Sequence, residues 1–285
     1  MRVDSPAKLN LVLRVLRKRK DGYHELCTLF HRISLHDTLS LKKGTEGIRL
    51  FCSHPRVPKK NNLIVRAFHL LKANRPFPGG VTVRLTKRIP IGGGLGGGSG
   101  NAAAFLVAMN RLFHLGLSKK KLMKLGEKLG SDVPFFISGA RHAMGEGRGE
   151  KIKPLPFKKR LWFVLLTHPR GLSTRRVYQG FRPSERPVSL TALRRDVRIG
   201  SVLLEKRKPE RASEFLVNDL LPSAERLRPS LKKIRESLSE LHLGICYMSG
   251  SGPTQFLIFS SRQKALQAIR RLRNFGKQIL LCHSN

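Results

Sequence analysis

A run of glycines sets the strongest limit on what this chain folds into. Seven glycines lie within Pro90–Gly100, between the strand-like segment Val81–Leu85 and the nearly all-apolar segment Asn101–Leu115, which predicts a buried helix. Glycine lets backbone amides approach a ligand closely, and a helix N-terminus attracts anions. The run therefore predicts a phosphate-binding loop between a strand and a helix.

Other kinds of glycine-rich segment fit this run less well. A Walker A loop ends in Gly-Lys-Ser/Thr, whereas this run ends in Ser99-Gly100, so the lysine is missing. A dinucleotide fingerprint can be placed on Gly92, Gly94 and Gly97, but the acid expected about 20 residues later is absent. A flexible linker is a further alternative, although such linkers seldom run straight into a buried helix.

The rest of the chain mixes strand-like and helix-like segments. Apolar or small side chains occupy every odd position of Val3–Val15, which is strand periodicity with one buried face, and Lys8 and Asn10 share the other face. Further strands are expected at Ile33–Leu41, Ile48–Phe51, Val81–Leu85, Leu161–Thr167, Ile245–Met248, Gln255–Phe259 and Gln278–Cys282. Helices are expected at Asn62–Lys72, Asn101–Leu115, Ser118–Leu129, from Val133, at Ser173–Gly180 and Leu190–Val197, in pieces within Ser213–Leu241, and at Gln263–Leu272. This order predicts an α+β fold without regular strand-helix alternation.

The length of 285 residues favours two domains. Composition shifts at Lys153–Arg160, a proline-rich basic stretch, and we place the boundary there. The expected domains are residues 1–155, which contain the phosphate-binding loop, and residues 156–285.

The charge balance is unusual because acids are scarce. The chain has 56 Lys and Arg against 18 Asp and Glu, a net charge of +38, yet charged residues total 26%, about the average. Basic runs are scattered along the whole chain, which favours a solvated basic surface over one nucleic-acid groove. We expect no specific nucleic-acid partner, and a field that attracts anionic substrates.

Cysteine spacing and hydropathy favour a cytoplasmic protein. The four cysteines lie far apart with no C-x-x-C pair, so we expect reduced, unpaired thiols and no zinc site. No apolar stretch approaches the roughly 20 residues that span a bilayer. The segment after Met1 lacks the features of a secretory signal. No membrane partner is expected.

Six segments spread along the chain carry a more specific signature. They are Ser5-Pro6-Ala7-Lys8-Leu9-Asn10-Leu11, Asp21-Gly22-Tyr23-His24, Asn62-Leu63-Ile64, the glycine loop with Asn101-Ala102-Ala103, Ser131-Asp132-Val133-Pro134, and Ser249-Gly250-Ser251-Gly252-Pro253. The loop resembles the Pro-x-x-x-Gly-Leu-Gly pattern of the GHMP kinase superfamily, which includes galactokinase, homoserine kinase and mevalonate kinase. The first two segments resemble its cytidine-specific branch, the diphosphocytidyl-methylerythritol kinases.

The resemblance implies a two-domain GHMP-kinase-like fold. Residues 1–155 would form an ATP-binding α+β domain resembling one in a small-subunit ribosomal protein, and residues 156–285 a ferredoxin-like domain on the substrate side, with the active site between them. The implied reaction is ATP-dependent phosphorylation of the 2-hydroxyl of 4-diphosphocytidyl-2-C-methyl-D-erythritol in the non-mevalonate isoprenoid pathway, with Mg²⁺. The implied partner is this small cytidine diphosphate substrate, and a monomer or weak homodimer is expected.

Phosphoryl transfer needs a proton acceptor and positive charge near the transferred group. By resemblance, Asp132 accepts the proton of the substrate hydroxyl and Lys8 orients that hydroxyl and offsets charge. For Asp132 the alternative is an ordinary helix cap, and for Lys8 a solvated strand lysine. Since the chain has only six aspartates, few candidates for the base exist.

The glycine loop is expected to bind the ATP phosphates. Its residues are Pro90, Gly92, Gly93, Gly94, Leu95, Gly96, Gly97, Gly98, Ser99 and Gly100, with Ser99 a hydroxyl donor. Superfamily relatives often carry serine where Gly97 and Gly98 stand, and the cytidine branch commonly has one where Gly100 stands. These departures leave the protein ligands of Mg²⁺ open.

The substrate site is expected to hold a cytosine ring and phosphates. By resemblance, Tyr23, His24 and Tyr178 hold the cytosine, since tyrosine rings stack well on bases. Asn10 is expected to bind the substrate in a joint site with Lys8. Arg148 is expected to reach a substrate phosphate. The alternatives are a packing role in a hairpin for Tyr23, a hairpin-turn arginine for Arg148, and a plain hairpin connection for the Gly250–Gly252 turn.

Two other functions remain open at this stage. A GHMP-type kinase for another alcohol, such as homoserine or mevalonate, would keep the loop but would not need the tyrosines. A non-catalytic basic module that binds RNA would need neither Asp132 nor the loop, and its RNA binding would be salt-sensitive and unaffected by ATP.

Overall fold

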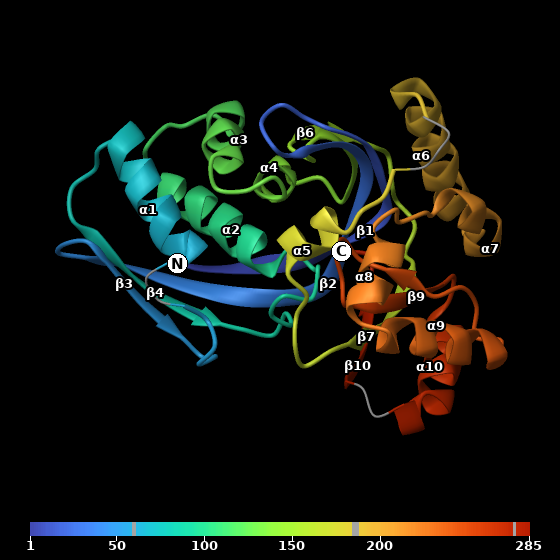
Figure 1. Ribbon diagram of the computed structural model, residues 1–285. Helices are drawn as coiled ribbons and strands as arrows, with labels where there is room; N and C mark the ends of the chain where they lie inside the picture. Colours follow the sequence, from blue (N-terminus) through green and yellow to red (C-terminus); the bar gives the residue numbers. More distant parts are fainter. Residues whose placement is uncertain (59–60, 184–187, 276–277) are drawn as a thin grey trace.

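The computed structural model describes residues 1–58, 61–183, 188–275 and 278–285. Two sheets form its frame, each with helices packed on it. Helices α1 (Leu63–Asn74) and α2 (Gly97–Leu112) lie along the long ribbon of β1 (Arg2–Lys18) and β2 (His24–Gly44), and the second sheet lies below the right-hand part of that ribbon (Figure 1).

The first sheet is organised around β2. This strand pairs with β1 along one edge, and along the other with β4 (Gly80–Thr86) and then β5 (His142–Gly147). The outer strands β3 (Ile48–Cys52) and β6 (Lys151–Pro154) pair with β4 and β5. The predicted alternation in β1 is confirmed, because its odd positions from Ala7 to Val15 are buried. Lys8 and Asn10 on the opposite face are also buried, because α2 and the glycine loop cover that face.

Four helices cover the first sheet and close its core. They are α1, α2, α3 (Lys119–Glu127) and α4 (Val133–Ser138). Asn62 and Ser118 cap α1 and α3, since each side chain accepts a hydrogen bond from a first-turn amide. Apolar side chains of these helices and of β2 and β4 form one buried cluster that includes Leu39, Val83, Phe68, Phe105 and Leu106.

The second sheet has the order β10-β7-β9-β8, with all pairs antiparallel. Its strands are β7 (Trp162–Thr167), β8 (Tyr247–Met248), β9 (Gln255–Phe259) and β10 (Gln278–His283). Helices α5 (Thr174–Gln179), α6 (Leu190–Glu205), α7 (Pro209–Ala212), α8 (Leu221–Leu227) and α9 (Ser230–Glu240) follow β7, and α10 (Arg262–Arg271) follows β9. Strand order 4-1-3-2 with helices in these places is the ferredoxin-like arrangement, which confirms the predicted fold class.

The two sheets share a buried apolar cluster. Ala7 and Leu9 of β1 belong to it together with Phe163 of β7 and Phe256 of β9. Because this packing is continuous across the sheets, the division after residue 155 stays a prediction. Among the described residues, no helix is long and apolar enough to cross a membrane.

Some elements differ from those that the sequence predicts. Strands β5 and β6 were not among the predicted strands, because their glycines obscure the strand pattern, although a hairpin turn at Arg148 was one of the alternatives and is where the structure places this residue. Helix α2 begins at Gly97, inside the glycine run, because Gly96 takes a left-handed backbone conformation that turns the chain into the helix. Helix α6 extends to Glu205, beyond the predicted end at Val197. Tertiary packing extends α6, because Gly200, Ser201 and Leu204 beyond the predicted end are buried.

A buried pair of histidines joins β2 and β5. Nδ1 of His31 lies 2.9 Å from Nδ1 of His142, and their Nε2 atoms each lie 2.9 Å from a serine Oγ, of Ser284 and Ser201 respectively. Burial lowers the pKa of His142 to about 3 and holds the pKa of His31 well below its usual value of 6.5. Both rings are therefore neutral in the folded protein at neutral pH.

This pair predicts a loss of stability in mild acid. Below about pH 6.5 the histidines of the unfolded chain bind protons while the folded pair does not, so the free energy of unfolding falls with pH, by up to about 1.4 kcal/mol per pH unit for each ring. Chemical denaturation at pH 7, 6 and 5 measures this slope. The exposed His69→Gln variant should keep the slope, and a wild-type stability that is flat between pH 6.5 and 5 would contradict the prediction.

Candidate active site

A cleft of about 1300 Å³ lies where β1, β2, the glycine loop, the start of α4 and α5 meet. The predicted site residues that line it are Lys8, Asn10, Tyr23, His24, Pro90, Gly92, Gly93, Gly94, Leu95, Gly96, Gly97, Gly98, Ser99, Asp132, Arg148 and Tyr178. Gly100 is outside this lining. It is buried against β1, where an added Cβ would lie 2.9 Å from Oγ of Ser5, and its assignment as a phosphate ligand stays a prediction.

The glycine loop is held against two neighbouring segments. The amide of Lys8 donates to the carbonyl of Leu95 at 3.0 Å, and the amide of Thr254 donates to the carbonyl of Gly93 at 3.2 Å. Gly94 has φ +77°, and a Cβ there would lie 2.2 Å from the carbonyl oxygen of Ser249. Glycine is therefore required at this position for both backbone conformation and space.

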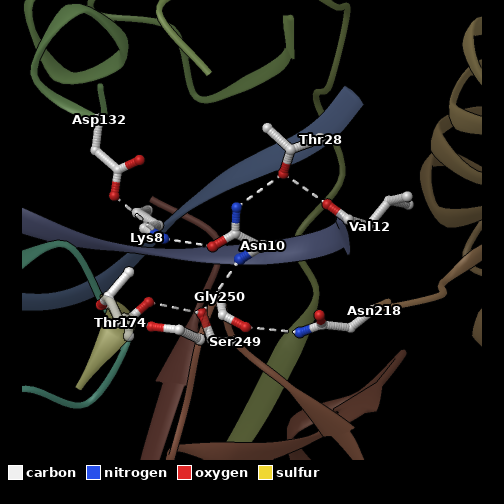
Figure 2. A network of polar contacts seen from close by, with 11 residues as sticks. Lys8, Asn10, Val12, Thr28, Asp132, Thr174, Asn218, Ser249 and Gly250 are labelled. Carbon is white, nitrogen blue, oxygen red and sulfur yellow. Dashed lines mark hydrogen bonds and ion pairs between the residues drawn. The ribbon is translucent and has the colours of Figure 1, made fainter. Parts of the chain in front are cut away.

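Lys8 and Asp132 meet in the cleft, and Figure 2 shows them pointing toward one another. Nζ of Lys8 lies 3.3 Å from Oδ2 of Asp132, and their side chains are 4% and 29% exposed. Lys8 is thus not a solvated strand lysine. Asp132 precedes α4 but makes no capping hydrogen bond to the described residues of that helix. The structure brings both side chains to the mouth of the glycine loop, where a Cβ added at Gly96 would lie 3.0 Å from Cγ of Lys8.

A hydrogen-bond network fixes the position of Lys8 (Figure 2). Its ammonium donates to Oδ1 of Asn10, and Nδ2 of Asn10 donates to Oγ1 of Thr28 at 2.8 Å. The Thr28 hydroxyl in turn donates to the carbonyl of Val12 at 2.6 Å. The Ser249 hydroxyl accepts a hydrogen bond from the backbone N–H of Asn10 at 3.2 Å and donates one to the backbone carbonyl of Gly94. The network ties the lysine to the glycine loop.

Aromatic side chains gather at the other end of the cleft. The rings of His24 and Tyr178 are stacked with centroids 5.2 Å apart, and Phe181 meets His24 edge-on at 6.0 Å. Tyr23 is 54% exposed, so it does not pack in a hairpin core. The guanidinium of Arg148, in the β5–β6 turn, lies 4.7 Å from the centre of the Tyr23 ring.

Burial sets the ionisation of this aromatic end. It lowers the pKa of His24, and the charge of Lys18 lowers it further, so the imidazole is neutral at neutral pH. Burial also raises the pKa of Tyr178, with a smaller contribution from the charge of Asp132. The neutral imidazole has one donor and one acceptor nitrogen, which suits a base edge.

Several lining residues were missed by sequence reasoning. Thr28, Lys87, Thr174 and Phe181 line the cleft beside the predicted residues. An aromatic residue three positions after Tyr178 was a signal for Phe181. The others carried no local signal, because strands and loops distant in sequence bring them here.

Comparison with known proteins shows which protein families this chain resembles. Family models described as GHMP kinases N terminal domain and GHMP kinases C terminal match residues 62–140 and 202–278. The 4-diphosphocytidyl-2-C-methyl-D-erythritol kinase of Syntrophus aciditrophicus (strain SB) is 38% identical over 99% of this chain and 98% of its own length. The kinase of the same name from Chromobacterium violaceum is 40% identical over 94% of this chain and 89% of its own length.

Solved structures agree with this result. A crystal structure of 4-(cytidine 5'-diphospho)-2C-methyl-D-erythritol kinase is similar with a TM-score of 0.79 and 34% identity, covering 99% of this chain and 98% of that chain. A homoserine kinase from Cytophaga hutchinsonii has a TM-score of 0.72 at 17% identity over 100% of this chain and 94% of that chain, which shows the fold alone.

A glycine loop facing a lysine and an aspartate between these two sheets defines a GHMP kinase, an ATP-dependent enzyme that phosphorylates an alcohol group of a small molecule. Identity to relatives over nearly the full length narrows the class further. The chain belongs to the 4-diphosphocytidyl-2-C-methyl-D-erythritol kinase family.

Proposed function

We propose that this enzyme transfers the γ-phosphoryl group of ATP to the 2-hydroxyl of 4-diphosphocytidyl-2-C-methyl-D-erythritol. The observation that carries the proposal is the Lys8–Asp132 pair at the mouth of the glycine loop, with an aromatic end in the same cleft. The names of the relatives support the choice of substrate.

The proposed chemistry uses the pair directly. Asp132 is partly exposed to the cleft, so its carboxylate accepts the proton of the hydroxyl whose oxygen attacks the γ-phosphorus. Lys8 is held by Asn10 and donates toward the transferred group, whose charge it offsets. The bond between the γ-phosphorus and the bridging oxygen breaks. ADP is the leaving group of this step, and its phosphates stay bound to the glycine loop until it is released.

The aromatic end is proposed to bind the cytosine. A planar base gains from stacking on aromatic rings, and Tyr23, Tyr178 and Phe181 all line this end. Neutral His24 can donate to one base atom or accept from another. Arg148, above the Tyr23 ring, supplies positive charge near the substrate phosphates.

Magnesium is proposed to bind with the ATP phosphates, and the residues fit it. Oδ1 of Asn101 is buried, has no hydrogen-bond partner among the described residues, and belongs to a residue that lines the cleft with Ser99 and Asp132. The side-chain oxygens of these three residues are hard donors, and Mg²⁺ usually binds one or two protein oxygens together with phosphates and water. When bound, the ion neutralises charge on the phosphate oxygens.

We also propose that the protein works in the cytoplasm. All four cysteines are free thiols, as a reducing compartment requires, and three of them are buried.

Substrate choice tests the proposed function. ATP consumption is measured with diphosphocytidyl-methylerythritol beside homoserine, mevalonate and galactose at equal concentrations. We expect turnover with the cytidine substrate alone. Equal or faster turnover with another alcohol would assign the enzyme to a different GHMP-type reaction, and ATP binding without any turnover would contradict a kinase role.

Removing an aromatic ring should affect the two substrates unequally. Tyr178→Ala is expected to raise KM for the cytidine substrate about 10-fold, since base stacking contributes roughly 1–3 kcal/mol, while KM for ATP changes little. Steady-state kinetics with each substrate varied in turn measure both values. Phe51→Ala removes an exposed ring outside the cleft and should leave both unchanged. Equal shifts of the two KM values after Tyr178→Ala would discard the stacking role.

A further inference from the structure

A buried ion pair lies beside the glycine loop, outside the machinery described above. Lys87 directly follows β4, and its ammonium pairs with the carboxylate of Asp37 on β2. Asp37 is fully buried and the Lys87 side chain is only 6% exposed. Removing two charges from water is costly, and such a pair is often no more stabilising than neutral residues of similar size. Stability alone therefore does not account for it.

The carboxylate of Asp37 has partners besides the lysine. Its Oδ1 accepts hydrogen bonds from the amides of Arg88 at 2.7 Å and Ile89 at 2.9 Å. Lys87 contacts the other oxygen, Oδ2. Within the described ranges Asp37 is the ammonium's only hydrogen-bond partner, and an ammonium has three hydrogens to donate. Lys87 thus has donors left for a second anion.

The second anion would lie at the glycine loop. Lys87 lines the cleft, and its Nζ lies 3.2 Å from the position of a Cβ added at Gly97. Gly97 is the first residue of α2, where free amides and the positive end of the helix favour an anion. The absence of a side chain at Gly97 leaves the ammonium beside these amides.

We propose that Lys87 binds a phosphate of the nucleotide and that Asp37 positions it. Lys87 would contact the phosphates as the lysine of a Walker A loop does, but it follows β4 and is not part of the glycine loop. Asp37 holds the ammonium in place before the nucleotide arrives. The ammonium keeps its contact with Oδ2 and donates to the phosphate through another of its hydrogens, while the two amides hold Oδ1. This inference rests on the proposed function, because it assumes that the glycine loop binds ATP.

A charge-neutral double variant tests it. Asp37→Asn with Lys87→Met removes one positive and one negative charge, so the net charge is unchanged, and the asparagine oxygen still accepts from the two amides. Binding of ATP and of adenosine to the full-length protein is measured by calorimetry, together with the melting temperature. We expect ATP to bind about 10- to 100-fold more weakly, the loss of one charge-assisted hydrogen bond, and adenosine to bind as in the wild type.

A single variant separates the two residues. Asp37→Asn alone keeps the Lys87 ammonium but removes the carboxylate that positions it, so ATP should bind about 2- to 5-fold more weakly than in the wild type, a smaller loss than in the double variant. No loss in this single variant would remove the positioning role of Asp37. Unchanged ATP affinity in the double variant, or an equal loss for ATP and adenosine, would overturn the role of Lys87. A loss in Asp37→Asn as large as in the double variant would assign the effect to Asp37. If the wild type itself fails to bind ATP, the proposed function fails and not this inference alone.

Discussion

Asp132→Asn is expected to lower kcat by about 10²- to 10⁴-fold, the usual contribution of a positioned general base. Asparagine has the same shape but cannot take up the proton that the hydroxyl releases. The carboxylate lies 3.3 Å from Nζ of Lys8 and is the partly exposed member of the pair, so it is accessible to a substrate. Because ATP is proposed to bind through the glycine loop, its dissociation constant should change by less than about threefold in this variant.

The measurement combines single-turnover kinetics with ATP titration. Asp196→Asn is the matched control, since this aspartate pairs with Arg195 on α6 outside the cleft, and its turnover should equal that of the wild type. Lys8→Met is expected to lose activity to a similar extent, and the double variant Lys8→Met/Asp132→Asn little more than either single variant, because the two act as a unit. Full activity of Asp132→Asn would rule out this residue as the base.

Gly94→Ala should cost both stability and nucleotide binding. The backbone here has φ +77°, which costs an alanine about 1–2 kcal/mol. Its Cβ would also lie 2.2 Å from the Ser249 carbonyl oxygen, and that backbone atom cannot turn away as a side chain can. Relief by a shift of the loop adds about 1–3 kcal/mol. The free energy of unfolding should fall by about 2–5 kcal/mol, and ATP affinity by at least about 10-fold.

Gly139→Ala separates the conformational cost of an alanine at positive φ from the cost of the steric clash. Gly139 has φ +75°, nearly the same, but nothing lies within 4 Å of the added Cβ. This variant should lose only the conformational part, about 1–2 kcal/mol, and bind ATP normally. Denaturant unfolding and calorimetric titration of both variants decide the matter. Equal stability losses in the two variants would show that the contact with Ser249 has no effect.

The glycine loop illustrates how far a local pattern reaches. Its composition predicted a phosphate-binding segment between a strand and a helix, and the structure places it there, lining the cleft after β4 and leading into α2. The same pattern did not show that α2 begins at Gly97, nor that Gly100 turns away toward Ser5. Those details depend on what packs against the loop.

Lys8 and Asp132 illustrate the opposite limit. The local sequence allowed either a catalytic or a purely structural role for each residue, and a family resemblance favoured the catalytic role. The packing of α2 and the glycine loop over β1 buries Lys8, and the start of α4 delivers Asp132 to it. Neither event is visible in the few residues around either position. Their roles in catalysis stay predictions until the variants are measured.

The sequence by itself determined the secondary structure of β1, the site of the glycine loop and the α+β class, because strand periodicity and glycine content act through near neighbours in the chain. Only the tertiary structure decided that His31 meets His142 and that Lys87 lies between Asp37 and the loop. These contacts join segments distant in sequence. Burial and charge at such points arise when sheets and helices pack together, and no local pattern encodes them.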